Sequence, residues 1–192
     1  MTIRPLAASA GIALLLSLGA CSGKDDTPAA AASSSADAGH GTLASTIGSA
    51  PGLTTLSAAL SQAGLGDVFD GPGSYTILAP DDDAFAKLGE TGKSLSDPAN
   101  RAEMVAILRG HILPGHLTPD AIKKAIADKK GPVSMRTLAD SMVTFSADGD
   151  SIVATGADGA KATIDGAPLV ASNGVVLPLD GLIKSPPAAK AP

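Results

Sequence analysis

Three consecutive aspartates at positions 81–83 are the densest group of side chains in this chain that could carry chemistry. They stand in the stretch TILAPDDDAFAKL (76–88), directly after an apolar run and a proline. Adjacent carboxylates can bind a cation, act as acid and base, or accept hydrogen bonds from the first amides of a helix. A calcium loop alternates its ligands with spacers and places a glycine at its turn, and this stretch does neither. We therefore expect Asp81 or Asp82 to start a helix whose Phe85 faces the core.

The three histidines are the other residues that could bind a metal or move a proton. His111 and His116 stand five residues apart, a spacing that does not bring two imidazoles to one helical face. A zinc site would need further ligands. His111 falls on an apolar stripe, so we expect a buried histidine whose ring nitrogens hydrogen-bond to the backbone. A ligand or catalytic role for His111 is the alternative.

The sequence lacks the motifs of nucleophilic catalysis and of nucleotide binding. It contains no Gly-x-Ser-x-Gly nucleophile elbow. The glycine pairs at 64–66 and 71–73 lack the third glycine and the phosphate-loop lysine. Asp180 precedes Gly181, and an acid in this position is expected to shape a turn. We therefore expect no catalytic residue, no metal and no cofactor.

The composition limits the partner and the kind of core. The chain has 192 residues and a formal net charge of −5, so it offers no basic surface to neutralise a nucleic-acid backbone. Aromatic residues make up 2 % of the chain, with no tryptophan, which removes the stacking platforms of single-strand binders. Apolar residues still reach 44 %. Length and composition therefore predict one domain with a core of aliphatic side chains.

The first twenty residues are typical of a secretory signal peptide. Arg4 precedes an apolar run that ends at Leu18 and is too short for a comfortable membrane span. The run leads into LGAC (18–21), which resembles the lipobox of bacterial lipoproteins. Cys21 is the only cysteine in the sequence, so we expect it to carry a lipid anchor and expect no disulfide within the chain.

Residues 21–40 and 186–192 are expected to be disordered because of their composition. They contain almost no bulky apolar side chains whose burial could offset the entropy lost on ordering. We expect the first segment to tether a domain at 41–185 to a membrane. Ser22, directly after the cysteine, resembles the outer-membrane sorting signal of bacterial lipoproteins. The KDD at 24–26 is either a surface-export signal or a solvated charge run.

The apolar periodicity predicts the order of elements within the domain. It predicts helices at 53–63, 98–114 and 119–130 and a short strand at 75–79. From residue 132 onward, short β-type runs alternate with turn pairs. These pairs are Asp148-Gly149, Asp158-Gly159, Asp165-Gly166 and Asn173-Gly174. Helices first and strands afterwards predict an α+β domain, not a series of βαβ units.

Three stretches together resemble the fasciclin (FAS1) domain family. The stretch TILAPDDDAFAKL (76–88) is similar to the first box of the family, and ASNGVVLPLDGLI (171–183) is similar to the second. Between them, ILRGHILPGHLT (107–118) resembles the histidine box. The order and separation of the three match the family across residues 42–185.

The resemblance implies the FAS1 fold, an α+β fold of short helices packed on a wedge-shaped β-sandwich or meander. It implies structural roles for Pro80, Asp81, Phe85, His111, Asn173, Gly174 and Asp180, and the histidine is expected to tie the helical region to the sheet. The family usually has a tyrosine where this chain has Gly110. Animal matrix relatives have an Asp-Ile pair, linked to integrin contact, where this chain has Pro168 and Leu169. Integrin-type recognition is therefore not carried over.

The resulting hypothesis is a lipoprotein whose single fasciclin domain binds a protein or glycan at the bacterial cell envelope, with no nucleic-acid partner. The family resemblance implies a binding module without enzyme activity. The expected partner surface is IDGAPLVASNG (164–174), in which Pro168 would keep the segment at a sheet edge and leave Leu169 accessible. The alternative is that Leu169 and Val170 pack inward. Two other functions stay open: a carrier of a small apolar ligand such as a carotenoid, and an enzyme on envelope polymers with two acids converging in a cleft.

Overall fold

The computed structural model describes residues 41–95 and 97–184. Three predicted segments lie outside these residues and stay predictions: the signal peptide (1–20), the lipidated Cys21 with its tether (21–40), and the tail (186–192). Within the described ranges, no helix is long and apolar enough to cross a membrane.

The strands form two four-stranded sheets. The first sheet has the order β2-β1-β8-β7 and the second has the order β3-β4-β5-β6. The strands are β1 (Tyr75–Pro80), β2 (Ile112–Pro114), β3 (Val133–Arg136), β4 (Met142–Asp148), β5 (Ser151–Thr155), β6 (Lys161–Thr163), β7 (Leu169–Ala171) and β8 (Gly174–Leu179). The two central strands β1 and β8 run parallel, and every other pair is antiparallel. The second sheet is therefore a simple meander, while the first joins strands from distant parts of the chain.

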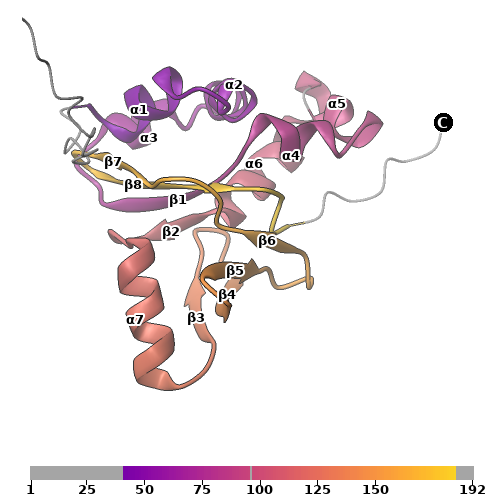
Figure 1. Cartoon of the computed structure of the whole chain (residues 1–192). Coiled ribbons are helices and arrows are strands. Elements are labelled where there is room, and N and C mark those ends of the chain that lie inside the picture. The colour runs from indigo at the N-terminus through magenta and orange to yellow at the C-terminus, as the bar shows by residue number, and fades with distance from the viewer. Residues whose placement is uncertain (1–40, 96, 185–192) are drawn as a thin grey trace, which may run out of the picture. The chain divides into compact units, whose positions relative to one another are not determined.

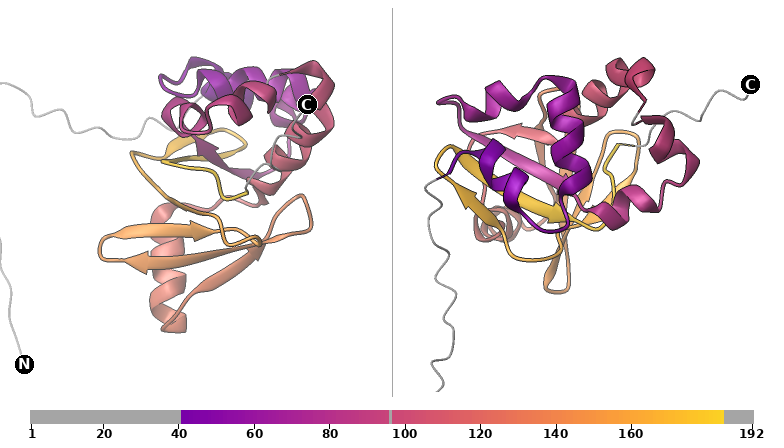
Figure 2. Two further views of the ribbon diagram at one scale, coloured as in Figure 1. Left: turned by 90° about the vertical axis from the view of Figure 1, so that its right-hand side faces the viewer. Right: turned by 90° about the horizontal axis from the view of Figure 1, so that it is seen from above.

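Short helices cover the first sheet, and one longer helix packs against the second. In chain order they are α1 (Leu43–Ser49), α2 (Thr54–Ala63), α3 (Gly66–Asp70), α4 (Asp82–Ala86), α5 (Glu90–Leu95), the 3₁₀ turn η1 (Pro98–Asn100), α6 (Arg101–Gly110) and α7 (Pro119–Lys129). Figure 1 shows α1 to α3 above the first sheet and α7 beside strands β3 to β5. The left view of Figure 2 shows the same layering of helices, first sheet and second sheet, and the right view shows the helices lying over the first sheet from above.

Two apolar clusters make up the core, one on each face of the first sheet. Ile77 of β1 points into the cluster below the helices, together with Leu56 of α2. Leu78, the next residue of β1, points into the other cluster, together with Phe145 of β4 and Ile122 of α7. Because both faces of this sheet are covered, β1 and β8 are apolar along nearly their whole length. This arrangement confirms the predicted α+β fold, with aliphatic side chains in most core positions.

Several predicted elements are confirmed at their ends. Helix α2 stops at Gly64, which takes the left-handed conformation (φ 70°) that glycine adopts without strain. Helix α7 starts after Thr118, whose side chain accepts a hydrogen bond from the Ala121 amide. It ends on Lys130 in the left-handed conformation, one residue before the expected Gly131. The predicted strand at 75–79 is β1.

The predicted helix at 98–114 is wrong at both ends. Its first turn is the 3₁₀ turn η1, capped by Asp97, whose side chain accepts from the Ala99 amide. Its last predicted residues leave the helix after Gly110, and Ile112–Pro114 pair with β1 as strand β2. The apolar spacing continues through this change, because Ile112 of the strand faces the same cluster as Ile107 and Leu108 of the helix before it, while Leu113 faces the other cluster. Long-range pairing with β1 therefore outweighs a local helical pattern.

Some of the predicted turn pairs lie at hairpin turns in the structure, and one does not. Gly149 and Asp150 form the two-residue turn between the paired strands β4 and β5. The turn between β7 and β8 is Ser172-Asn173, so that Gly174 is already the first residue of β8. Asp165-Gly166 closes no hairpin, because β6 and β7 belong to different sheets. That segment carries the chain from the second sheet back to the first.

Candidate functional site

The first and second of the three aspartates cap two different helices. The side chain of Asp81 accepts from the Ala84 amide at 2.6 Å, which caps α4 and confirms that prediction. The side chain of Asp82 instead accepts from the amides of Thr55 (2.7 Å) and Thr54 (3.3 Å), the first residues of α2. Asp83 is exposed in the first turn of α4. The acidic run therefore joins α4 and α2, and two of its carboxylates are engaged with backbone amides.

The electrostatics of Asp82 fit this capping role. Its partial burial alone would raise its pKa, but hydrogen bonds from Thr55 and Thr54 outweigh burial and hold the pKa below its ordinary value. A general acid needs a shift in the opposite direction, because it must keep its proton near neutral pH. Asp82 is therefore suited to carry a fixed negative charge at the start of α2.

His111 lies in the core, with both ring nitrogens bonded to the backbone. Its Nε2 accepts from the Ile183 amide at 3.0 Å, so this nitrogen carries no proton. Its Nδ1 therefore carries the proton and donates to the Ile107 carbonyl at 2.9 Å. The ring is neutral and joins the end of α6 to the segment after β8, as the histidine prediction required. Burial lowers the pKa of His111 to about 4, with the charge of Lys184 acting in the same direction; the Ile107 bond and Asp158 oppose the shift.

Asn173 and Gly174 hold the turn between β7 and β8 against the helices. The Asn173 side-chain oxygen accepts from the Leu43 amide at 2.8 Å, and its nitrogen donates to the carbonyls of Phe69 (2.7 Å) and Gly71 (2.8 Å). A Cβ at position 174 would lie about 2.1 Å from the carbonyl oxygen of the neighbouring strand β1, which excludes any other residue without a shift of the backbone. Both residues therefore have a structural role, in which they hold the β7–β8 turn in place.

Asp180 joins the end of β8 to the second sheet. Its carboxylate accepts from the Thr163 amide at 2.7 Å, and its carbonyl accepts from Lys87 Nζ at 2.9 Å. Pro80 is the last residue of β1, and Phe85 is buried in α4. The structure thus brings Pro80, Asp81 and Asp180 to the same end of the two central strands, where Asp81 N donates to the carbonyl of Leu179.

The expected partner surface lies at a sheet edge, as predicted. β7 is the last strand of the first sheet and pairs only with β8. Pro168 and Leu169 are half-buried, and Leu169 packs partly against the first cluster while remaining accessible. The alternative that Leu169 and Val170 pack inward holds in part for Leu169, which contacts the first cluster, and both side chains are half-buried.

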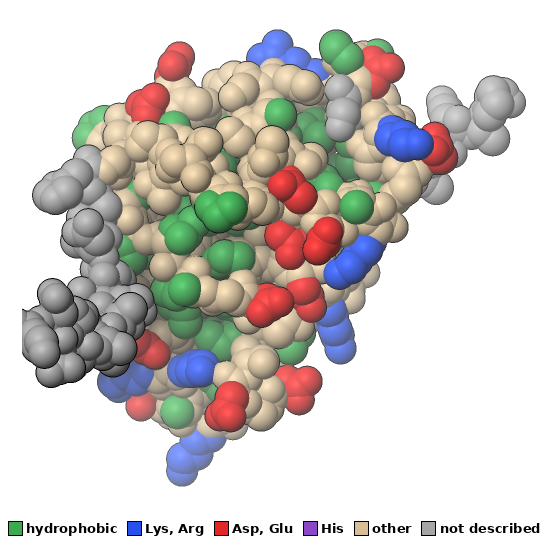
Figure 3. All heavy atoms as spheres, turned by 45° about the horizontal axis from the view of Figure 1, so that its top comes forward, with side chains coloured by type: hydrophobic (Ala, Val, Ile, Leu, Met, Phe, Trp, Pro, Cys, Tyr) green, Lys and Arg blue, Asp and Glu red, His purple; other side chains and the backbone are tan. Residues whose placement is uncertain are grey.

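A groove of about 600 Å³ opens beside this strand, between the α1–α2 connection and the sheet edge. Its lining includes six apolar residues, Ala50, Pro51, Leu53, Ala167, Leu169 and Pro178, together with Asp81. In the sheet register, Leu169 pairs with Val176, whereas Asp81 lies past Leu179 at the end of β8. Asp81 therefore lies at one end of the groove. We call this feature the edge groove. Figure 3 shows hydrophobic and acidic side chains side by side on this helical face of the molecule.

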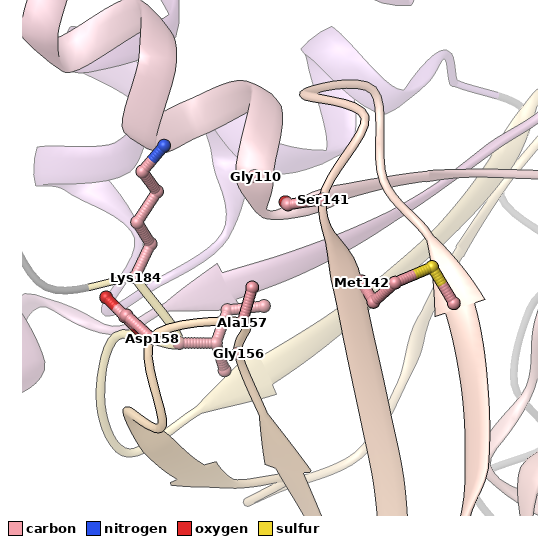
Figure 4. A pocket seen from close by; sticks show the side chains of 8 residues that line it. Gly110, Ser141, Met142, Gly156, Ala157, Asp158 and Lys184 are labelled. Atoms are coloured by element: carbon pink, nitrogen blue, oxygen red, sulfur yellow. The ribbon is translucent and has the colours of Figure 1, made fainter.

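A second, smaller cavity of about 90 Å³ lies next to Gly110, where the chain lacks the tyrosine usual in the family. Figure 4 shows Lys184 and Asp158 on one side of it and Met142 on the other. Gly156 forms part of the wall, and a Cβ there would lie about 1.6 Å from the carbonyl oxygen of Ile183. This close approach of two backbone segments leaves only a small hollow beside Gly110.

The part of the chain that the structure describes contains no group of three or more His, Cys, Asp or Glu side chains that could hold a metal. His116 lines a polar hollow with Asp70 and Asn173, but Asn173 already uses its side-chain atoms to hold Leu43, Phe69 and Gly71. The residues of the three sequence boxes therefore connect elements of the fold through hydrogen bonds. The edge groove, by contrast, has room for a partner.

Sequence reasoning missed two features of this site. Thr76 is a buried polar residue of β1 whose hydroxyl donates to the Gly115 carbonyl and accepts from the Leu117 amide. A threonine in an apolar run gives no hint of this bridge. The edge groove itself draws on four segments of the chain, of which only the one with Ala167 and Leu169 was expected from the sequence to form a partner surface.

The fold and the groove define a class: a two-sheet α+β domain that presents a surface for binding. The Fasciclin domain family model matches residues 51–185, so the chain belongs to the fasciclin domain family. Protein sll1483 of Synechocystis sp. is 32 % identical over 135 residues, which cover 70 % of this chain and 68 % of that protein. The transforming growth factor-beta-induced protein ig-h3 of Sus scrofa is 32 % identical over 131 residues, 67 % of this chain but only 17 % of that protein.

A solved structure shows the same fold. The FAS1 domain pair from the insect cell adhesion molecule Fasciclin I superimposes with a TM-score of 0.68 at 15 % identity. The match covers 77 % of this chain and 52 % of that one. The resemblance found in the three sequence boxes is thereby confirmed at the level of family and fold.

Proposed function

We propose that this chain is a binding module of the bacterial cell envelope, anchored in the outer membrane by a lipid on Cys21 and contacting a cell-surface protein or glycan. The observation that carries the proposal is the edge groove, an open apolar surface with Leu169 on an edge strand. Two apolar clusters hold the elements around it, so the groove can be presented without large rearrangement. The likeness to an insect cell adhesion molecule supports the same reading.

The residues best suited to catalysis are engaged elsewhere, which favours binding over an enzyme activity. Asp81 and Asp82 accept backbone amides at two helix starts, and Asp180 accepts the Thr163 amide. His111 uses both ring nitrogens within the core. An acid–base pair needs groups that are free to reach substrate from a cleft, and these four side chains are hydrogen-bonded to the backbone of the domain.

The alternative of an apolar-ligand carrier has less support. The cavity beside Gly110 has a volume of about 90 Å³. Pockets that hold drug-sized ligands have volumes of several hundred Å³, and a carotenoid is longer still. The edge groove is larger, at about 600 Å³, and lies at the surface beside an edge strand, which suits a surface contact.

The proposal is tested with the immobilised full-length chain carrying Cys21→Ser, so that no lipid contributes to binding. We expect one protein or glycan of a bacterial envelope extract to be retained and to be displaced by the same chain in free form. The heat-unfolded chain on the same support is the control. If the folded chain retains nothing beyond what this control retains, the binding-module proposal is wrong.

A further inference from the structure

We propose that the edge groove binds an extended segment of a partner protein in which apolar residues are followed by lysine or arginine. This inference rests on the binding function proposed above and names the partner chemistry. The apolar residues would lie on the floor beside Leu169, and the cations would lie at the acidic end beyond Pro178.

The charge at that end is the first argument. Asp81 lines the groove itself. The amide of Asp82 donates to the carbonyl of Gly52, a groove residue, at 2.8 Å, and the amide of Asp165 donates to the carbonyl of Pro178, another groove residue, at 2.9 Å. These contacts fix three carboxylate-bearing residues around one end of the groove.

Positive charge is scarce at the same place. Neither lysine nor arginine is among the described residues that line the groove. Lys87, which approaches this end, directs its Nζ to the carbonyl of Asp180. Asp83, next to the capping aspartates, is exposed in the first turn of α4 and adds a further negative charge. An approaching cation is therefore attracted, and an approaching anion is repelled.

The edge strand is the second argument, because it favours a polypeptide over other occupants. β7 pairs with β8 on one side only, and Leu169 of this strand lines the groove. Edge strands present backbone groups that can pair with an added strand. Among residues 41–95 and 97–184, the contact next to this edge is at the far end of β7, where the Ser172 amide donates to the carbonyl of Gly41 at 2.9 Å. An extended segment can therefore lie along Leu169 and Val170 toward the acids.

The test uses two labelled peptides of equal length, one of leucines followed by lysines and one of leucines followed by glutamates. Their binding to the full-length chain with Cys21→Ser is measured by fluorescence anisotropy at low and high salt. We expect the lysine peptide to bind more tightly than the glutamate peptide and to lose affinity as salt rises. Asp83→Asn with Asp165→Asn should weaken it about fivefold, the effect of removing two exposed ion pairs.

The matched control carries Asp148→Asn and Asp150→Asn, which remove the same net charge from the exposed β4–β5 turn in the second sheet. We expect this control to bind the lysine peptide like the unmodified chain. Equal binding of both peptides, or equal weakening by both double variants, would overturn the inference. If the chain still retains an envelope component in either of those cases, the binding function stands and the partner class is wrong. Displacement of the lysine peptide by envelope glycan alone would likewise overturn the peptide assignment.

Discussion

The buried imidazole of His111 makes the stability of this domain depend on pH in a defined direction. In the folded state its pKa is lowered to about 4, chiefly by burial, whereas an unfolded histidine titrates near 6.5. Between these two values the unfolded chain binds a proton that the folded chain does not. Protonation therefore favours unfolding, so the contribution of His111 is complete above pH 6.5 and is lost as pH falls toward 4.

The magnitude follows from the shift. A difference from 6.5 to about 4 corresponds to about 3 kcal/mol in the free energy of unfolding. The geometry explains the loss. In the neutral ring, Nε2 accepts a hydrogen bond from the Ile183 amide, and a second ring proton on Nε2 would face that N–H group directly. This loss is a large part of the roughly 5–15 kcal/mol that stabilises a typical domain.

The assay is denaturant unfolding of the full-length chain at several pH values from 4 to 7.5, compared with His111→Phe. We expect the variant to be less stable at pH 7.5, because the Ile107 carbonyl and the Ile183 amide lose their partner at about 1–3 kcal/mol each. We also expect a flatter profile between pH 6.5 and 4. His116→Ala, which removes an exposed histidine, should keep the profile of the unmodified chain. Parallel profiles for His111→Phe and the unmodified chain would refute the reasoning.

Three further predictions test the residues that connect elements of the fold, and the anchor. Gly174→Ala should destabilise the domain by several kcal/mol or prevent folding, because its Cβ would lie about 2.1 Å from the carbonyl oxygen of Tyr75; thermal unfolding measures this. Asp82→Ala should lower the free energy of unfolding by about 1 kcal/mol, because it removes the cap of α2. The pKa of Asp82 is lowered in the folded state, so the stabilisation by its carboxylate should fade as pH falls below about 4. Asp83→Ala is the matched control and should change stability little. Cys21→Ser should release the protein from membranes, and a variant that still sediments with them after a high-salt wash would contradict the anchor.

The features that could be predicted from the sequence are those set by a few neighbouring residues. Asp81 precedes a helix and caps it, and Thr118-Pro119 starts α7, because an N-cap needs only its own first turn. Gly64 ends α2 for an equally local reason. The three boxes gave the family, and with it the fold, because their order along the chain carries information that no single box has.

The features that could not be predicted depend on residues far apart in the chain. Ile112–Pro114 continue a helical apolar pattern but form β2, because β1 offers them backbone partners. Asp82 caps a helix that begins 28 residues earlier, and no local pattern distinguishes it from Asp81. The edge groove is built from four separate segments, so only Leu169 and its neighbours could be selected in advance, through their place at an expected sheet edge.

The most direct test of the central claim is the binding of Leu169→Asp to bacterial surfaces, measured together with its melting temperature. Leu169 is half-buried, so we expect binding to be lost while the melting temperature falls by only a few degrees. Ala167→Trp, which fills the groove from an exposed position, should have the same effect on binding. Val68→Asp, a matched change at an apolar residue that is 41 % exposed on α3, should bind normally. If both groove variants fold and bind like Val68→Asp, the edge groove is not the binding surface.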